Sequence, residues 1–354
     1  MTLRRALVLA ATALAFGVVA LGAYVRLSDA GLGCPDWPGC YGHLVGVPDN
    51  AHEQAAAARA FPGKPVEPAK AWKEMVHRYF AGALGLLILA ICGLSWRREA
   101  RHRQSPALPT ALLPIVGLQA LLGMWTVTLL LKPLVVTAHL LGGMTTLALL
   151  VSLAASEDSR RSPAVGPGLR PSALATLLAV AAQIALGGWV SSNYAALACA
   201  DFPTCHGTWA PTMDFRHAFT LHRELGQTAD GALLSQEALT AIHWTHRLGA
   251  LVVTGLVSAT ALRLLRENGW QGWGGALLGL LLLQVGLGIA NVALSLPLPL
   301  AVAHNLGAAA LLTATLLLNL RLARALPALS RQALQNLAVD AAKPPVAHDQ
   351  NVIA

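Results

Sequence analysis

The chain has 354 residues, of which 55% are hydrophobic and 12% are charged, and its formal net charge is +8. This composition is too apolar for a water-soluble domain of that length and indicates an integral membrane protein. The positive charge does not indicate a nucleic-acid partner, because the arginines flank apolar stretches instead of forming one basic face.

Eight apolar stretches, taken in chain order, are each close to the length of about 20 residues that a helix needs to cross a bilayer. They lie at residues 7–26, 75–95, 108–130, 134–154, 172–192, 241–262, 274–295 and 298–320. We therefore predict an all-α integral membrane protein with eight transmembrane helices, arranged in the lipid bilayer as two pseudo-symmetric four-helix bundles.

An internal repeat relates the two halves of the chain at an offset of 165 positions. The matched pieces are Val19–Cys40 with Ile184–Cys205, Gln119 with Gln284, Gly123 with Gly288, and Ala138-His139 with Ala303-His304. The repeat predicts an N-terminal half at 1–160, a C-terminal half at 161–330 and a disordered cytoplasmic tail at 331–354. The stretch at 7–26 is expected to be a membrane helix and not a signal peptide, since its counterpart at 172–192 is internal.

Arginine is concentrated on one side of the eight-span arrangement, as the positive-inside rule predicts for the cytoplasmic side. These residues are Arg4, Arg5, Arg97, Arg98, Arg101, Arg103, Arg160, Arg161, Arg170, Arg263, Arg266, Arg321 and Arg324. We expect a multi-pass protein of the inner (cytoplasmic) cell membrane with both termini in the cytoplasm.

Two long loops, at 27–73 and 193–240, lie on the opposite side of the membrane and contain four of the five cysteines. An oxidising compartment outside the cytoplasm allows Cys34 to pair with Cys40 and Cys199 to pair with Cys205. The fifth, Cys92, falls within an apolar stretch, and we expect it to be an inert core residue.

Four histidines recur at matched positions near the outer ends of their membrane spans, and they are His77, His139, His246 and His304. Ionisable residues inside a membrane are costly and therefore indicate function. Two facing imidazoles in a four-helix bundle are typical axial ligands of haem iron, which predicts one haem site in each half. The alternatives are packing histidines and, with less support, a zinc or copper site.

An arginine follows the first histidine of each pair, as Arg78 after His77 and Arg247 after His246. A guanidinium in this position can bind a haem propionate bidentately, and the alternative is an arginine that reaches the lipid headgroups. Three glutamines, Gln119, Gln183 and Gln284, begin a Gln-x3-Gly pattern, and we interpret them as interhelical hydrogen-bond donors.

The halves differ at three polar positions. Glu74 stands three residues before His77, whereas His243 stands three residues before His246, so each shares a helix face with its histidine. Glu74 is our candidate catalytic residue, because a carboxylate beside a porphyrin can handle protons, and its alternative role is that of a charge near a helix start. His243 is a pocket candidate. The other differences are Arg26, a further pocket candidate, against Ser191, and Asp29 against Tyr194. They favour chemistry in the N-terminal half.

These residues together resemble the haem A synthase family (CtaA/Cox15), in the bacterial form with paired extracytoplasmic cysteines. The matching segments are Gly22-Ala-Tyr-Val-Arg-Leu-Ser28, Glu74-Met-Val-His-Arg78, Thr137-Ala-His139, His243-Trp-Thr-His-Arg247 and Ala303-His-Asn305. The resemblance implies an oxidoreductase that converts the C8 methyl group of haem O into the formyl group of haem A, which cytochrome oxidase requires.

Site roles follow from the same resemblance. It implies that His77 and His139 ligate haem O as the substrate with Glu74 at its edge, while His246 and His304 hold a haem b cofactor. It implies a first-loop disulfide of structural or redox function and a structural second-loop disulfide. Expected partners are haem O, haem A, haem O synthase, cytochrome oxidase assembly factors and a second copy of this chain in a homo-oligomer.

Three other functions use the same features. An electron-transferring membrane cytochrome b needs the paired histidines but not Glu74. A thiol-oxidising membrane protein needs the loop cysteines in reactive form, together with a quinone. A haem carrier or assembly protein without substrate chemistry binds haem O and releases it unchanged.

Overall fold

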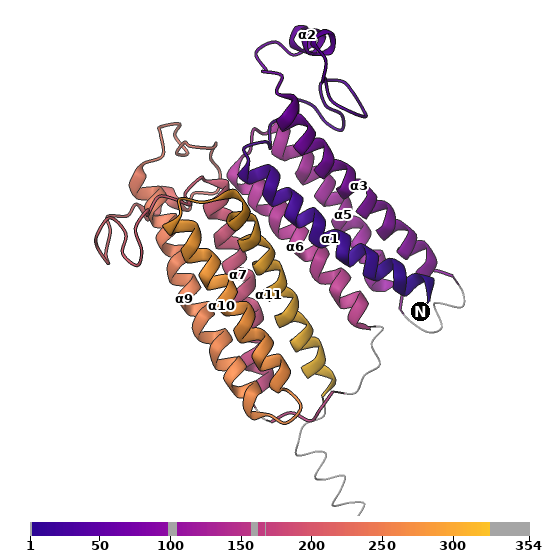
Figure 1. Cartoon of the computed structure of the whole chain (residues 1–354), viewed down its shortest axis with the longest axis vertical. Coiled ribbons are helices and arrows are strands. Elements are labelled where there is room, and N and C mark those ends of the chain that lie inside the picture. Colours follow the sequence, from indigo (N-terminus) through magenta and orange to yellow (C-terminus); the bar gives the residue numbers. More distant parts are fainter. Residues whose placement is uncertain (1, 98–104, 157–161, 167, 326–354) are drawn as a thin grey trace, which may run out of the picture.

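A computed structural model describes residues 2–97, 105–156, 162–166 and 168–325. Eight long helices dominate it (Figure 1): α1 (Leu3–Leu27), α3 (Pro68–Ser95), α5 (Ala107–Thr128), α6 (Pro133–Ser156), α7 (Leu169–Ser192), α9 (Gln236–Arg266), α10 (Gln271–Ala293) and α11 (Leu298–Arg324). All eight are long and apolar enough to cross a membrane, which confirms the predicted eight-span, all-α membrane protein. The predicted tail at 331–354 lies outside the described residues.

The second long helix of each half begins before the predicted apolar stretch. α3 starts at Pro68 and α9 at Gln236, where the side chain of Ser235 caps the amide of Ala238. Their first turns are polar, so apolar composition alone places their starts too late. His77 is therefore about two and a half turns inside α3, at 3.6 residues per turn. Two short helices, α2 (Ala51–Ala60) and α8 (Phe215–Ala218), belong to the loops.

The long helices pack as two sets of four (Figure 1). In the first set α1 contacts α3 and α6, while α5 completes the ring between α3 and α6. In the second set α7 contacts α9 and α11, while α10 lies between α9 and α11. The sets meet through α1, α6, α7 and α11. Each contact in one set has its counterpart in the other, which is consistent with the predicted pair of four-helix bundles.

One continuous apolar core joins the two sets. It takes buried residues from all eight long helices, and its fully buried side chains include Leu112, Leu147, Leu277, Leu318 and Trp270. Small residues such as Ala11 and Ala173 allow close approach of the central helices. Leucines at other positions of the same helices stay exposed in the isolated chain, as expected of a surface that faces lipid.

The predicted loops project from one end of the helices, opposite to the N-terminus (Figure 1). Among the described residues there is no β-strand, and the loops contain only isolated bridges, such as Cys40 with His43 and Cys205 with Thr208. These two bridges occupy matched positions of the repeat. The loops of the two halves therefore begin with the same tight turn.

Candidate functional site

The four predicted histidines lie on α3, α6, α9 and α11 and form the two pairs expected from the sequence. His77 and His139 are close enough for their charges to interact, and so are His246 and His304. All four residues are half-buried, and the Nδ1 atoms of His77, His139 and His304 are buried without a hydrogen-bond partner. Unpartnered imidazole nitrogens inside a helical bundle are suited to ligation.

Each of these imidazoles packs against a glycine on the preceding long helix. A Cβ atom built on that glycine would approach the ring Cε1 atom to 3.0 Å for Gly22 and His77, 3.4 Å for Gly123 and His139, 3.1 Å for Gly187 and His246, and 3.2 Å for Gly288 and His304. A Cβ atom at Gly22, Gly187 or Gly288 would crowd the ring, whereas at Gly123 it would make an ordinary van der Waals contact. Matched offsets in the repeat are the sequence signal for these four glycines.

The three glutamines connect helices, as predicted. Gln119 Nε2 donates to the backbone carbonyl of His139 at 3.0 Å, and Gln183 Nε2 donates to that of His246 at 2.9 Å. Gln284 Nε2 lies 3.4 Å from the ring of His304. The glycines that follow the histidines, Gly142, Gly249 and Gly307, make room for these amides.

Both predicted disulfides are present, with S–S distances of 2.08 Å for Cys34–Cys40 and 2.01 Å for Cys199–Cys205, and Cys92 is free and buried. An aspartate folds each ring. Asp36 accepts hydrogen bonds from the two backbone amides that directly follow Cys40, and Asp201 accepts them from the two that follow Cys205. Hydrogen bonds, first of all from the Thr204 hydroxyl, hold the pKa of Asp201 well below its usual range.

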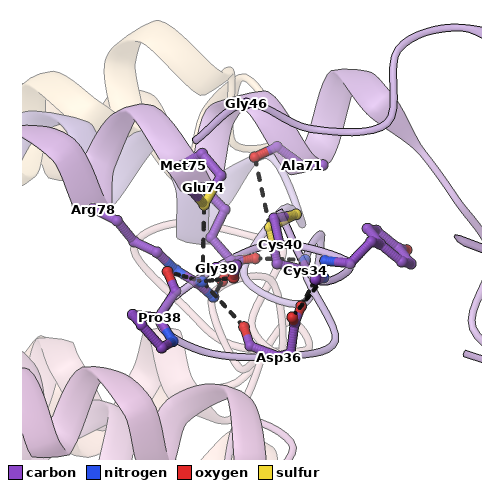
Figure 2. Close-up of a disulfide and its surroundings, with 12 residues drawn as sticks. Cys34, Asp36, Pro38, Gly39, Cys40, Gly46, Ala71, Glu74, Met75 and Arg78 are labelled. Atoms are coloured by element: carbon purple, nitrogen blue, oxygen red, sulfur yellow. Dashed lines mark hydrogen bonds and ion pairs between the residues drawn. A yellow bond between two sulfur atoms is a disulfide. The ribbon is translucent and has the colours of Figure 1, made fainter. Parts of the chain in front are cut away.

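Glu74 and Arg78 attach the first disulfide loop to α3 (Figure 2). The Glu74 side chain is buried, with the residue 5% exposed, and its Oε2 accepts the Cys34 amide at 3.0 Å. Its other oxygen forms an ion pair with Arg78. Arg78 also donates to the carbonyls of Asp36, Pro38 and Gly39. The carboxylate therefore sits between the haem-ligand candidate on α3 and the loop.

His243 and Arg247 perform the same attachment in the second half. The Cys199 amide lies 3.3 Å from His243 Nδ1, and Arg247 Nε lies 3.2 Å from His243 Nε2. Arg247 donates to the carbonyls of Cys199, Asp201 and Thr204 at 2.7–2.8 Å. Both predicted propionate ligands contact loop carbonyls, and Arg78 also pairs with Glu74 and Arg247 with His243. Their contact with a propionate stays a prediction.

Arg26 lies at the contact between α1 and α7. It donates to the Ser191 carbonyl at 2.5 Å, and its guanidinium stacks 3.9 Å from the centre of the Tyr194 ring. The Tyr194 hydroxyl donates to Asp29 at 2.9 Å. Position 26 matches 191 in the repeat and position 29 matches 194, so two of the three differences between the halves contact each other. Packing between the halves explains these two differences. The third difference, Glu74 in the first half against His243 in the second, is not explained by packing between the halves.

A family model described as "Cytochrome oxidase assembly protein" matches residues 5–316 of the chain. The chain belongs to the COX15-CtaA family. A "Heme A synthase" of Shewanella oneidensis is 44% identical over 305 residues, which make up 85% of this chain and 91% of that protein. Proteins of the same name from Caulobacter sp. and Halalkalibacterium halodurans are 29% and 27% identical over 85% and 65% of this chain and 91% and 72% of their own lengths. The COX15-CtaA match includes both histidine pairs and Glu74.

Proposed function

We propose that the chain is a haem A synthase, an oxidoreductase that converts the C8 methyl group of haem O into the formyl group of haem A for cytochrome oxidase. The observation that carries this proposal is the 44% identity to a protein of that name over 91% of its length. The structure supports it with two pairs of facing histidines in one membrane-spanning chain.

The histidine pairs fit haem in their donor chemistry. Each pair offers two imidazoles, which is the number that a six-coordinate haem iron takes from a protein. Three of the four rings carry a buried nitrogen without a partner, and every ring packs against a glycine. His246 and His304 would hold haem b as the cofactor, and His77 and His139 would hold haem O as the substrate. Haem b, when bound, supplies electron transfer.

Within this proposal Glu74 handles the protons that the oxidation of a methyl group releases. It lies one turn before His77 on α3, and Arg78 and the Cys34 amide fix the direction of its carboxylate. The attached disulfide loop keeps the Glu74 side chain buried. In the second half His243 has the same place, so we assign the chemistry to the first half.

We further propose the location that the sequence indicates, in the inner membrane with both termini in the cytoplasm. Arg4, Arg170, Arg263 and Arg324 lie at the helix ends opposite to the disulfide loops, as the positive-inside rule requires. The disulfides then lie in an oxidising compartment. Haem O synthase and oxidase assembly factors are the proposed partners.

The proposal is tested by the pigment that the protein makes. The chain is expressed with a haem O synthase in a bacterium that lacks its own haem A synthase, and extracted haems are identified by mass. Haem A is the expected product. If only haem O and haem b are found, the chain is a membrane cytochrome b or a haem carrier. That second function has one observation in its favour, because attachment of the loop explains Glu74 without any substrate chemistry.

Replacement of Gly187 by alanine tests whether His246 is a haem ligand. The new methyl group would meet the imidazole at 3.1 Å, so the ring must turn or move by a few tenths of an ångström. We expect an altered EPR signal of the bound haem b. Gly82→Ala is the matched control, since a Cβ atom at Gly82 meets nothing within 4 Å. An unchanged signal in Gly187→Ala would remove His246 from the ligand set.

A further inference from the structure

The four histidines differ in how their neighbouring helices hold them. On α5, α7 and α10 a glutamine precedes the ring-contacting glycine by one helical turn, as in Gln183 and Gly187. On α1 the same place before Gly22 is taken by Val18, which has no polar group. His77 is therefore the one member of the two pairs whose glycine partner comes without a glutamine.

The glycine that makes room for a glutamine side chain is also absent beside His77. Beside His139, His246 and His304 the amide occupies the space over a glycine three residues after the histidine, and a Cβ there would meet the glutamine Oε1 at 2.6 Å or less. Three residues after His77 stands Phe80. The site around His77 therefore lacks both the glutamine, replaced by Val18 on α1, and the glycine that would make room for it, replaced by Phe80 on α3.

Gln183 shows what the amide does. Its Nε2 atom donates to the His246 carbonyl at 2.9 Å and lies 3.0 Å from Nδ1 of the same imidazole. One side chain thereby links α7 to α9 and limits rotation of the ring. In an apolar bundle an amide has few other partners, and groups of this kind around metal-ligating histidines fix the ligand and strengthen binding.

The Nδ1 atoms of His77, His139 and His304 are all buried without a partner. What distinguishes His77 within the described residues is that no glutamine amide bonds either its ring or its backbone carbonyl, whereas Gln119 bonds the carbonyl of His139 and Gln183 bonds that of His246. We propose that Gln119, Gln183 and Gln284 are positioning residues for His139, His246 and His304, and that His77 is the ligand that releases the iron when haem leaves the first site. This inference rests on the proposed function, in which the first half exchanges substrate for product and the second retains its cofactor.

The test compares haem release from the purified, haem-loaded protein to excess apomyoglobin. Gln183→Val copies the first half into the second, and it is expected to raise the rate of haem b release about tenfold, the typical effect of an outer-shell partner. The EPR signal of that haem should shift as the ring gains freedom. The control is Gln227→Val, on an exposed loop glutamine.

The reciprocal variant, Val18→Gln with Phe80→Gly, supplies the amide and its slot to His77. It should slow release of haem from the first half about tenfold. Gln284→Val serves as a second loss variant should Gln183→Val fail to fold. The inference is overturned if both the folded loss variant and the reciprocal variant release haem at the same rate as the unmodified protein. This holds even if the unmodified protein makes haem A. A wild-type protein that binds haem but makes no haem A would contradict the proposed function instead, and the release rates would still decide the role of the glutamines.

Discussion

The His246→Ala protein is expected to lose the haem b of its second half and to form no haem A. Removing one of the two proposed haem ligands would leave His304 as the single imidazole available to hold the haem in the second half. The haem content of the purified protein, measured as its pyridine haemochrome, should fall to that of the first half alone. Haem A in extracts should fall below detection.

The control for this variant is His222→Ala, which changes an exposed loop histidine. It should retain both haems and normal haem A formation. If His246→Ala retained its second haem with an unaltered spectrum, the assignment of the second pair would be wrong. If it lost the haem but still made haem A, a cofactor role for that haem would be wrong, although its ligands would be correctly assigned.

The Glu74→Gln variant is expected to fold, to bind haem and to form haem A about 10²–10⁴-fold more slowly, which is the typical contribution of a positioned proton acceptor. The amide oxygen of glutamine can still accept the Cys34 amide. Arg78 keeps its three carbonyl acceptors in the loop. The variant therefore removes the negative charge of Glu74 while the disulfide loop stays attached to α3. Formation of haem A is followed by mass in membranes supplied with haem O.

The matched variant is His243→Gln, which introduces the same side chain at the corresponding position of the second half. It should leave haem A formation within about twofold, because the second site retains its haem in the proposed mechanism. Free-thiol labelling confirms that Cys34 and Cys40 stay oxidised in both variants. Normal turnover by Glu74→Gln with an intact loop would show that Glu74 attaches the loop and does nothing more.

The fold was predictable because membrane-spanning helices can be identified from their apolar composition and length. Eight apolar stretches gave eight helices, and the error at the starts of α3 and α9 arose where polar first turns extend beyond the apolar core. The disulfides and the interhelical glutamines were also predictable, since the repeat shows the cysteine pair twice and matches Gln119 with Gln284, while Gln183 begins the same Gln-x3-Gly pattern. Polar groups in a bilayer need hydrogen-bond partners within the protein. This requirement favours an interhelical hydrogen bond as the role of Gln119, Gln183 and Gln284.

Partners of the arginines were not predictable. Arg78 and Arg247 meet backbone carbonyls whose positions depend on the path of the disulfide loops, and no spacing in the sequence encodes that path. The contact of Arg26 with Tyr194 arises only when the two halves dock. A comparison of the halves position by position treats each difference as independent. The differences at positions 26 and 29 in fact belong to one contact between the halves.

That contact has a consequence for the ancestry of the chain. In a symmetric dimer of identical subunits, residues on the twofold axis face their own copies, so an arginine there would meet an arginine. Joining two copies in one gene removes this restriction, because each side can mutate alone. The Tyr194 hydroxyl donates to Asp29, its match in the repeat, and two aspartate carboxylates could not make this hydrogen bond. The two halves produced as separate polypeptides should therefore assemble with each other in preference to themselves.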